Sequence, residues 1–331
     1  MKTFLISQND AGQRLDKFLT KAVPLLPAAL LYKYIRLKRI KRNHQRCQIS
    51  DRLREGDLLE LYINDEFFSP PGADEAFFHA PAQLDLLYED ENILVVNKPA
   101  GLIVHADDKE VWDTLINRIL KYLYEKKEYD PAQENSFVPA LCNRIDRNTS
   151  GIVLAAKNAT ALRELNQRIR DRELQKRYLC VVHGKMPQRE ETLTAYLKKD
   201  ADKNQVRVYP QPVPGGRTIQ TAYRVLAQKK DLSLLQVSLL TGRTHQIRAH
   251  MAYLGHPLLG DGKYGKNTDQ QLGYRFQALC AYQVRFSFSE SDGPLGYLNG
   301  KTVTVPQVDF VTALFPEAAA LFKRQEGKNG A

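Results

Sequence analysis

The chain has 331 residues, of which 43% are hydrophobic, 26% charged and 9% aromatic, the composition of an ordinary globular protein. These values exclude a disordered chain, a collagen and a small disulfide-stapled protein, and the length suits about two domains with cores of their own. The 48 Lys and Arg exceed the 38 Asp and Glu, and this net charge of +10 favours a polyanionic partner such as RNA, DNA or an anionic membrane surface.

Cysteine usage and the N-terminal residues indicate a compartment. The four cysteines lie far apart, without a Cys-x-x-Cys pair, so reduced thiols in the cell interior are the better interpretation. The first residues lack a charged leader followed by a long apolar run, and no window approaches the roughly 18 apolar residues of a membrane-spanning helix. We therefore expect a soluble, cytoplasmic protein with no membrane partner.

Residues 1–64 are predicted to form a small α+β domain. Apolar side chains recur at helical spacing over Leu15–Val23 and again over Leu30–Ile35, which predicts two short helices. Cys47–Ser50 and Asp57–Ile63 are typical of short strands.

The positive charge is concentrated in this segment, where residues 1–63 hold 13 Lys and Arg against 6 Asp and Glu, a net charge of +7. A solvated helix face would also explain such a run of charge. This run lies between predicted elements, however, which favours contacts with phosphates. Its candidate phosphate-contacting residues, which would bind RNA if RNA is the partner, are Lys33, Arg36, Arg39, Lys41 and Arg42.

Residues 65–83 are the expected linker, because they combine Pro, Gly and acidic residues with aromatic pairs that can dock. Residues 84–331 are predicted to form a second, strand-rich domain. The strands expected there are Ile93–Asn97, Ile152–Ala156, Tyr178–Val182, Leu234–Leu240 and Tyr282–Phe288, and the helices are Trp112–Tyr124, Ala159–Arg170 and Thr244–Leu254.

Common metal and cofactor motifs do not fit the sequence. A calcium loop could begin at Asp146, but its twelfth position is Lys157 instead of Glu. His245 and His250 lie five apart on a predicted helix, which turns them about 140° away from each other, and no carboxylate has the spacing of a zinc ligand. The nucleophile-elbow, dinucleotide and nucleoside-triphosphate loop motifs are missing. We expect neither a metal nor a cofactor.

Asp146 is the candidate nucleophile or base. It belongs to NRIDRNTSGIVLAAKN, where it lies between Arg144 and Arg147 and precedes a tight turn that leads into a buried strand. Nearby cations favour the charged form of a carboxylate, and an anchored, ionised carboxylate can act as a nucleophile. The alternative is that Asp146 only ties down the turn through backbone hydrogen bonds.

Two further segments supply candidate partners for Asp146. SLLTGRTHQIRAHMAYLGHPLLGD places Arg243 at or just before a helix N-terminus, a position that suits an anion. Arg243 could therefore neutralise Asp146 or hold a phosphate, or Arg243, His245 and Arg248 could form a solvated first turn. LQKRYLCVVHGK places Tyr178 at the start of an apolar strand, where it could stack on a base or belong to the core.

These segments resemble the RluA-like pseudouridine synthases, a branch named for modification of large-subunit ribosomal RNA. The resemblance covers most of residues 84–310 and is carried by VVNKPAGLIVHA, NRIDRNTSGIVLAAKN, KRYLCVVHGK, GRTHQIRAHMAYLGHPLLGDGKYG and QALCAYQVRF, in this order. It implies a mixed, largely antiparallel α+β catalytic domain. More loosely, residues 14–61 resemble an S4-type RNA-binding domain, although RLKRIKRNHQRC replaces the usual glycine turn and Val-Asn-Gly hairpin.

The resemblance also implies a mechanism without metal or cofactor. Asp146 is implied to be the nucleophile that attacks a uridine flipped out of the RNA, so that the base detaches, rotates and reattaches through carbon. Arg243 is implied to pair with this aspartate, and Tyr178 to stack on the target base. The residues implied to support the turn or to contact RNA are Arg144, Arg147, Gly101 and His105.

Two positions depart from the family, which usually has His where Asn143 and Cys280 stand. Since neither is a catalytic position, we expect catalysis to be retained with altered surroundings or an altered target. The expected partner is RNA, most simply ribosomal RNA bound by a monomer. A transfer RNA target and a catalytically silent RNA-binding or ribosome-assembly protein are the alternatives.

Overall fold

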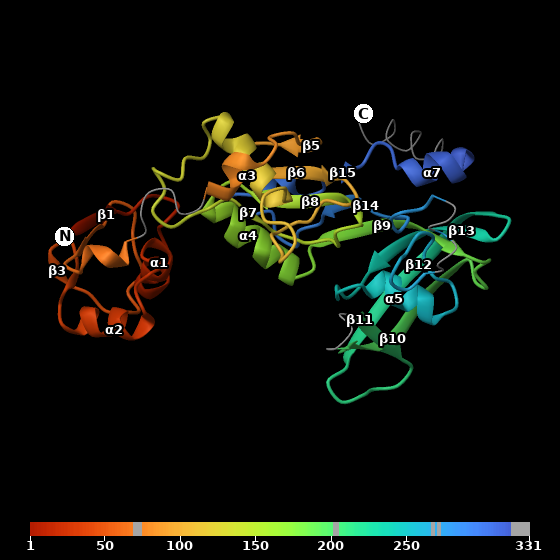
Figure 1. Cartoon of the computed structure of the whole chain (residues 1–331), viewed down its shortest axis with the longest axis horizontal. Coiled ribbons are helices and arrows are strands. Elements are labelled where there is room, and N and C mark those ends of the chain that lie inside the picture. Colours follow the sequence, from red (N-terminus) through yellow and green to blue (C-terminus); the bar gives the residue numbers. More distant parts are fainter. Residues whose placement is uncertain (69–74, 201–204, 266–268, 270–272, 319–331) are drawn as a thin grey trace.

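The computed structural model describes residues 1–68, 75–200, 205–265, 269 and 273–318, which form two β-sheets (Figure 1). A four-stranded sheet belongs to the N-terminal unit (residues 1–68), and an eleven-stranded sheet belongs to the large unit (residues 75–318). Neighbouring strands of the described residues pair antiparallel, except for one parallel pair in the large sheet. The predicted α+β class with a mixed, largely antiparallel sheet is therefore confirmed.

The N-terminal unit packs two helices on its sheet around a core of its own. The most deeply buried side chains of this core include Leu15, Phe18, Leu31 and Leu59. Both predicted helices and the second predicted strand are confirmed. The helices are α1 (Leu15–Ala22) and α2 (Ala28–Arg36), and the strands, in the spatial order β1-β4-β2-β3, are β1 (Lys2–Leu5), β4 (Leu58–Leu61), β2 (Ile40–Arg42) and β3 (Gln45–Arg46).

The predicted strand Cys47–Ser50 is wrong, because the chain pairs just before it as the β2–β3 hairpin. Asn43 and His44 form its turn with φ of 51° and 65°, and two left-handed residues are what a two-residue hairpin turn requires. The Asn43 amide bridges to β4, accepting from the Leu58 N–H and donating to Asp57 Oδ1, both at 2.8 Å. An Asn-His pair thus makes this turn without glycine.

Part of the linker packs on the large unit. Phe77 and Phe78 lie in a short 3₁₀ turn, η2 (Glu75–His79), and their ring centroids are 5.9 and 4.9 Å from that of Tyr124. An earlier 3₁₀ turn, η1 (Asp65–Phe67), packs on the N-terminal core instead. The middle of the linker, residues 69–74, lies outside the described residues. The domain boundaries at residues 64 and 84 stay a prediction.

The large sheet has the spatial order β11-β10-β12-β13-β9-β14-β8-β6-β5, with β15 beside β14 and β7 beside β8. Every strand predicted for this unit overlaps an observed one. The bounds are β5 (Leu86–Glu89), β6 (Ile93–Lys98), β7 (Ala140–Leu141), β8 (Ser150–Ala156), β9 (Leu174–His183), β10 (Glu190–Asp200), β11 (Gln205–Tyr209), β12 (Arg217–Lys229), β13 (Leu232–Leu239), β14 (Leu279–Phe286) and β15 (Thr302–Thr304).

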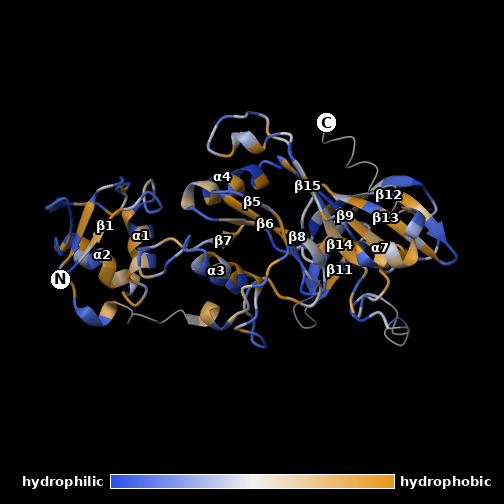
Figure 2. Cartoon of the chain, turned by 90° about the horizontal axis from the view of Figure 1, so that it is seen from above, coloured by the Kyte–Doolittle hydropathy of each residue, from blue (hydrophilic) through white to orange (hydrophobic). Residues whose placement is uncertain are grey.

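Helices cover both faces of this sheet, and apolar residues gather between the layers (Figure 2). One core takes side chains from α3 (Leu115–Glu125) and α5 (Gln246–Tyr253), and the other takes them from α4 (Ala159–Arg170) and α7 (Asp309–Leu314). The three predicted helices are confirmed, with later starts for α3 and α5. The Thr114 side chain caps α3 by accepting from Asn117 N–H, so the helix begins after Trp112.

None of the helices within the described ranges has the length and apolar character needed to cross a bilayer. The four cysteines are free thiols, and Cys180 and Cys280 are buried. Burial raises the pKa of both of these thiols to about 12.

Candidate active site

Asp146 lies on the turn that leads from β7 into β8. The Thr149 N–H donates to the Asp146 carbonyl oxygen at 3.1 Å and closes this turn. The carboxylate oxygen Oδ2 lies 2.8 Å from Nη1 of Arg248. The side chain of Asp146 is 26% exposed and that of Arg248 only 8%. A buried cation therefore holds one side of the carboxylate and leaves the other side open.

A second carboxylate, Asp261, holds Arg248 in place. Nε and Nη2 of Arg248 donate to the two Asp261 oxygens at 2.7 and 2.9 Å, and the Asp261 side chain is completely buried. Burial lowers the pKa of Arg248, but the two carboxylates outweigh burial and leave this pKa above its usual range. The guanidinium is a permanent charge whose orientation is fixed by its bidentate pair.

The predicted ion pair between Arg243 and Asp146 is wrong. Arg243 lies exposed in the loop before α5, where its backbone N–H donates to Gln246 Oε1 at 3.1 Å. Helix α5 begins at Gln246, and its first turn buries Arg248 beside the turn of Asp146. Both arginines stand in the same motif, but only Arg248 lies on α5, which places it against the carboxylate. A solvated first turn is likewise excluded for Arg248.

His245 completes the polar surroundings of Asp146. Its Nε2 lies 3.9 Å from Asp146 Oδ2, and its Nδ1 lies 2.9 Å from the hydroxyl of Tyr264. Burial lowers the pKa of His245, against the opposite effect of the Asp146 charge. His245 has φ of 55°, and non-glycine residues in such strained conformations gather at functional sites.

Tyr178 stands on β9, in the core that also contains Ile145. It is 9% exposed. Burial raises its pKa to about 12, and the negative charge of Asp146 adds to this increase. The phenol is therefore neutral and close to Asp146, at the apolar side of the site. Its stacking on a base stays a prediction.

Lys98 holds the backbone beside the Asp146 turn through hydrogen bonds, a role that the sequence did not predict. It is fully buried at the end of β6, and its Nζ donates to the carbonyl oxygens of Pro99, Leu102 and Arg147 at 2.8, 2.7 and 2.8 Å. The Gly101 N–H donates to the same Arg147 oxygen at 2.9 Å. Burial lowers the pKa of Lys98 to about 7, although Asp146 opposes this change. A lysine in a Lys-Pro-Ala-Gly stretch carries no sequence signal of burial.

Three predicted RNA contacts lie on the surface beside this turn. Arg144, Arg147 and His105 are exposed. Nη2 of Arg147 pairs with Asp107 Oδ2 at 2.7 Å. The pKa of His105 is lowered by partial burial and then by the charge of Arg144, so these two side chains lie near each other. The structure gathers all three next to Asp146, and their contacts with RNA stay predictions.

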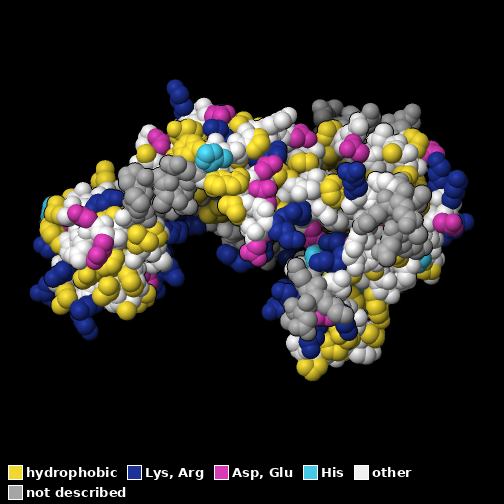
Figure 3. Space-filling model, viewed as in Figure 1, with side chains coloured by type: hydrophobic (Ala, Val, Ile, Leu, Met, Phe, Trp, Pro, Cys, Tyr) yellow, Lys and Arg dark blue, Asp and Glu magenta, His cyan; other side chains and the backbone are white. Residues whose placement is uncertain are grey.

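The predicted RNA-binding residues of the N-terminal unit divide into two groups. Lys33, Arg36 and Arg39 are exposed on α2 and just after it. Lys41 and Arg42 on β2 are half-buried, and Arg42 Nε pairs with Asp57 at 2.9 Å. In Figure 3 the molecule forms an arch, with the N-terminal unit as one leg and the β10–β12 extension as the other, and Lys and Arg side chains lie along parts of its inner side.

The two departures from the family occupy supporting positions. Asn143 Oδ1 accepts from the Leu154 N–H at 2.8 Å, which ties the segment before the turn to β8. Cys280 is 2% exposed on β14, where it pairs with Ser150 at the start of β8. Both residues therefore act on the framework of the turn.

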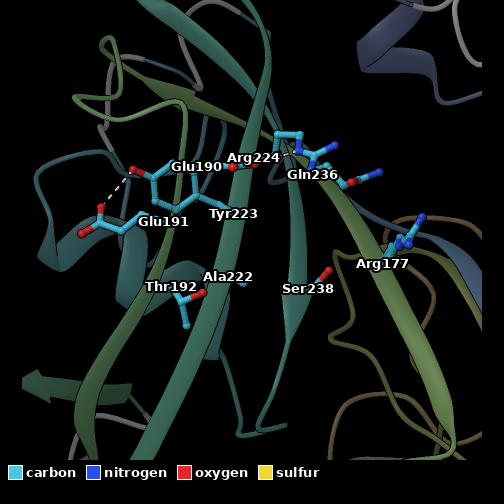
Figure 4. A pocket seen from close by; sticks show the side chains of 9 residues that line it. All are labelled: Arg177, Glu190, Glu191, Thr192, Ala222, Tyr223, Arg224, Gln236 and Ser238. Carbon is cyan, nitrogen blue, oxygen red and sulfur yellow. Dashed lines mark hydrogen bonds and ion pairs between the residues drawn. The ribbon is translucent and has the colours of Figure 1, made fainter.

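The large unit has a polar pocket elsewhere, of about 450 Å³, on strands β9, β10, β12 and β13 (Figure 4). Its Tyr223 hydroxyl donates to Glu191 Oε2 at 3.1 Å, and its Arg224 pairs with Glu190 at 3.2 Å. These carboxylates are already paired, and none of the residues around Asp146 lines this pocket. Three or more metal-ligating side chains do not cluster anywhere in the described ranges. The Asp146 group is therefore the candidate active site.

Comparison with known proteins identifies the family of this chain. A model of the RNA pseudouridylate synthase family matches residues 92–253, which include Asp146, Tyr178 and Arg248. An RNA pseudouridine synthase of Mycoplasma genitalium is 36% identical over 86% of this chain and 88% of its own length. The ribosomal large subunit pseudouridine synthase C of Vibrio vulnificus is 31% identical over 88% of this chain and 90% of its own length.

The fold agrees with these relatives. A solved structure, human RNA pseudouridylate synthase domain containing 1, superposes with a TM-score of 0.51 and covers 74% of this chain and 96% of its own, at 22% identity. The chain therefore belongs to the family of RNA pseudouridine synthases, isomerases that convert uridine in RNA into pseudouridine.

Proposed function

We propose that this enzyme modifies large-subunit ribosomal RNA and that Asp146 is its nucleophile. The observation that carries the proposal is the pairing of Asp146 with the buried Arg248, next to the neutral phenol of Tyr178. A carboxylate that is anchored on one side and open on the other can attack a bound substrate. The guanidinium of Arg248 fixes the orientation of this carboxylate through a charge-assisted hydrogen bond to Oδ2.

The reaction needs no atoms beyond those of the uridine. The bond between N1 of the base and C1′ of the ribose breaks, and a bond between C5 and C1′ forms. C5 loses a proton and N1 carries one in the product. The Asp146 carboxylate attacks C1′ as N1 leaves, and this bond breaks again when C5 bonds to C1′. The Tyr178 ring stacks on the base while it turns. Flipping the uridine out of its RNA costs a few kcal/mol, which stacking and phosphate contacts offset.

Delivery of the RNA is assigned to the N-terminal unit, as an S4-type RNA-binding domain of a cytoplasmic, monomeric enzyme. Its support is the net charge of +7 over residues 1–63 and the exposed Lys33, Arg36 and Arg39. The name of the Vibrio vulnificus relative favours ribosomal RNA. The alternative target is transfer RNA, because the active-site geometry does not depend on which RNA presents the uridine.

Asp146→Asn tests the mechanism. Asparagine keeps the size of the side chain but removes its negative charge and its nucleophilicity, so we expect no pseudouridine. RNA affinity should stay within about twofold, because phosphate contacts provide most of the binding. Base-resolved pseudouridine mapping of ribosomal and transfer RNA, treated with either purified protein, measures product and target together. Product from Asp146→Asn would overturn the mechanism, and product in transfer RNA alone would overturn the ribosomal target.

A further inference from the structure

In the parts of the chain that the structure describes, hydrogen bonds between polar groups join the two units. The core of the N-terminal unit takes its side chains from residues 4–68, and the cores of the large unit take theirs from Phe77 onwards. Among the described residues, no hydrophobic cluster joins the two units. Interfaces without a hydrophobic core allow domains to move relative to each other. The orientation of the N-terminal unit therefore depends on whatever hydrogen bonds cross the contact.

Asp10 is the centre of this contact. It lies in the loop between β1 and α1 and is completely buried. Asn135 Nδ2 of the large unit donates to Asp10 Oδ2 at 2.7 Å, and Ser136 Oγ donates to Asp10 Oδ1 at 2.6 Å. Within its own unit, Asp10 also accepts from Ser7 N–H and Ser7 Oγ. Buried carboxylates make strong hydrogen bonds to such donors.

Neighbouring side chains extend the contact on both sides of Asp10. Asn9 donates to Glu134 Oε1 at 2.9 Å and accepts from the Ala159 N–H at 3.1 Å, at the start of α4. Gln13 Nε2 donates to Ser136 Oγ at 2.9 Å. Two more bonds, from Asn135 to the Leu5 carbonyl and from Arg163 to the Ala11 carbonyl, bring the number between described residues of the two units to seven.

We propose that this latch, formed by Asn9, Asp10 and Gln13 with Glu134, Asn135, Ser136 and Arg163, sets the position of the N-terminal unit and thereby selects the uridine. Asp10 is a positioning residue, since it acts through the orientation of the RNA-binding surface. This rests on the proposed function, in which the N-terminal unit holds the RNA. With the arch held rigid, a phosphate contact at α2 and the Asp146 turn lie at a fixed spacing along one RNA.

A fixed spacing has a kinetic consequence. When one RNA spans both units, binding to the first unit makes binding at the second intramolecular, and the gain depends on the geometry of the link. An RNA that reaches only the Asp146 turn gains nothing from the latch. Opening the latch should therefore raise KM for a long RNA and leave the kinetic constants for a short stem-loop unchanged.

The test uses the full-length protein with Asn135→Ala and Ser136→Ala combined. These changes remove the donors to Asp10 from the side of the large unit and leave Ser7 bonded to Asp10 inside the N-terminal unit. Substrates are a large-subunit ribosomal RNA transcript and a short stem-loop that contains the mapped uridine. For the transcript we expect KM to rise roughly ten- to hundredfold, as expected for losing hydrogen bonds to a charged group, with unchanged kcat.

Two controls separate positioning from a general defect. Gln133→Ala removes only a bond to Asp130 in the same segment and should behave as wild type. Ser136→Thr keeps a hydroxyl that can donate to Asp10, so it should retain much of the wild-type KM for the transcript. Small-angle X-ray scattering should show a larger radius of gyration for the Asn135→Ala/Ser136→Ala protein. The proposal would be overturned if the wild type and the Asn135→Ala/Ser136→Ala protein had equal KM values for the transcript, or if KM rose equally for the stem-loop. Absence of product from the wild type would overturn the proposed function instead.

Discussion

At the scale of single residues, Arg248 determines the electrostatics of the site. One guanidinium contacts the Asp146 carboxylate through Nη1 and the buried Asp261 through Nε and Nη2. Lysine has a single nitrogen and cannot reproduce this fork. The fixed orientation of Asp146 therefore depends on the shape of the Arg248 side chain as well as on its charge.

Arg248→Lys should lower kcat roughly 100-fold, because the charge remains but lysine cannot hold Asp261 bidentately and contact Asp146 at the same time. Single-turnover kinetics on the mapped RNA measures this, with circular dichroism to check the fold. Arg243→Ala is the comparison, since the exposed Arg243 makes no ion pair with Asp146 in the structure. A larger loss from Arg243→Ala than from Arg248→Lys would contradict the assignment.

His250 is predicted to make the fold acid-sensitive. It is 1% exposed, its Nδ1 lies 3.0 Å from Thr221 Oγ1, and burial lowers its pKa to about 4. The same imidazole titrates near pH 6.5 when unfolded. Between these values the unfolded state binds more protons, so stability falls by up to about 3 kcal/mol as the pH drops from about 6.5 to about 4.

The measurement is urea unfolding of wild type and His250→Asn at about pH 7.5 and about pH 5. Asparagine can keep a hydrogen bond to Thr221 but does not titrate. The wild type should lose more stability than the variant between the two pH values. Parallel losses would show that His250 does not cause the acid sensitivity.

At the scale of elements, the parallel contact between β8 and β14 positions the turn that carries Asp146. Gly151 pairs with Ala281 in this contact, has φ of +107°, and a Cβ built on it would lie 2.3 Å from the Ala281 carbonyl oxygen. Only glycine fits this close approach of two backbones. The first residues of β8 are thus bound to the far end of the chain within a few positions of Asp146.

Gly151→Ala should destabilise the protein by about 2–5 kcal/mol, from backbone strain together with overpacking. Chemical denaturation measures this loss. Gly56→Ala is a matched control, because Gly56 also has a positive φ of +81° but nothing lies within 4 Å of its added Cβ, and it should cost only about 1–2 kcal/mol. Equal losses at the two positions would refute the close-contact argument.

Local signals explain which elements the sequence predicts. Asn158 caps α4 by accepting from the Ala161 N–H, and the observed helix has the predicted bounds, Ala159–Arg170. β10 carries several charged residues in EETLTAYLKKD, which hide its alternation. The β2–β3 hairpin depends on bonds from Asn43 to β4, a partner that lies further along the chain. Signals that depend on a distant partner leave no local pattern.

The same reasoning applies to the site. Asp146 is identifiable because its turn and the strand that follows lie together in the sequence. The choice between Arg243 and Arg248 depends on where α5 begins and on how it packs against the Asp146 turn, a tertiary contact across about 100 residues. Lys98 was missed for the same reason, since its acceptor at Arg147 lies 49 residues away.

At the scale of the whole molecule, we expect RNA binding by the N-terminal unit to depend on charge, and the reaction to depend on the residues around Asp146. Changing Lys33 and Arg36 together to Gln should weaken RNA binding and reduce the slope of log K against log salt by about 1 per lost phosphate contact. The value of kcat at saturating RNA should not change, because both residues lie in the N-terminal unit. Filter binding over a salt series measures the slope, and an unchanged slope would show that α2 does not contact phosphate.

The position of β14 also determines when the enzyme can become active during synthesis. This strand enters the sheet between β9 and β8, so the edge of β8 next to the Asp146 turn has no partner there until residues 279–286 have left the ribosome. The core of the N-terminal unit uses only residues 4–68 and can fold much earlier, since domains fold as units during translation. A nascent chain thus folds its proposed RNA-binding unit before the surroundings of Asp146 are complete. A prematurely terminated product would bind the RNA without modifying it.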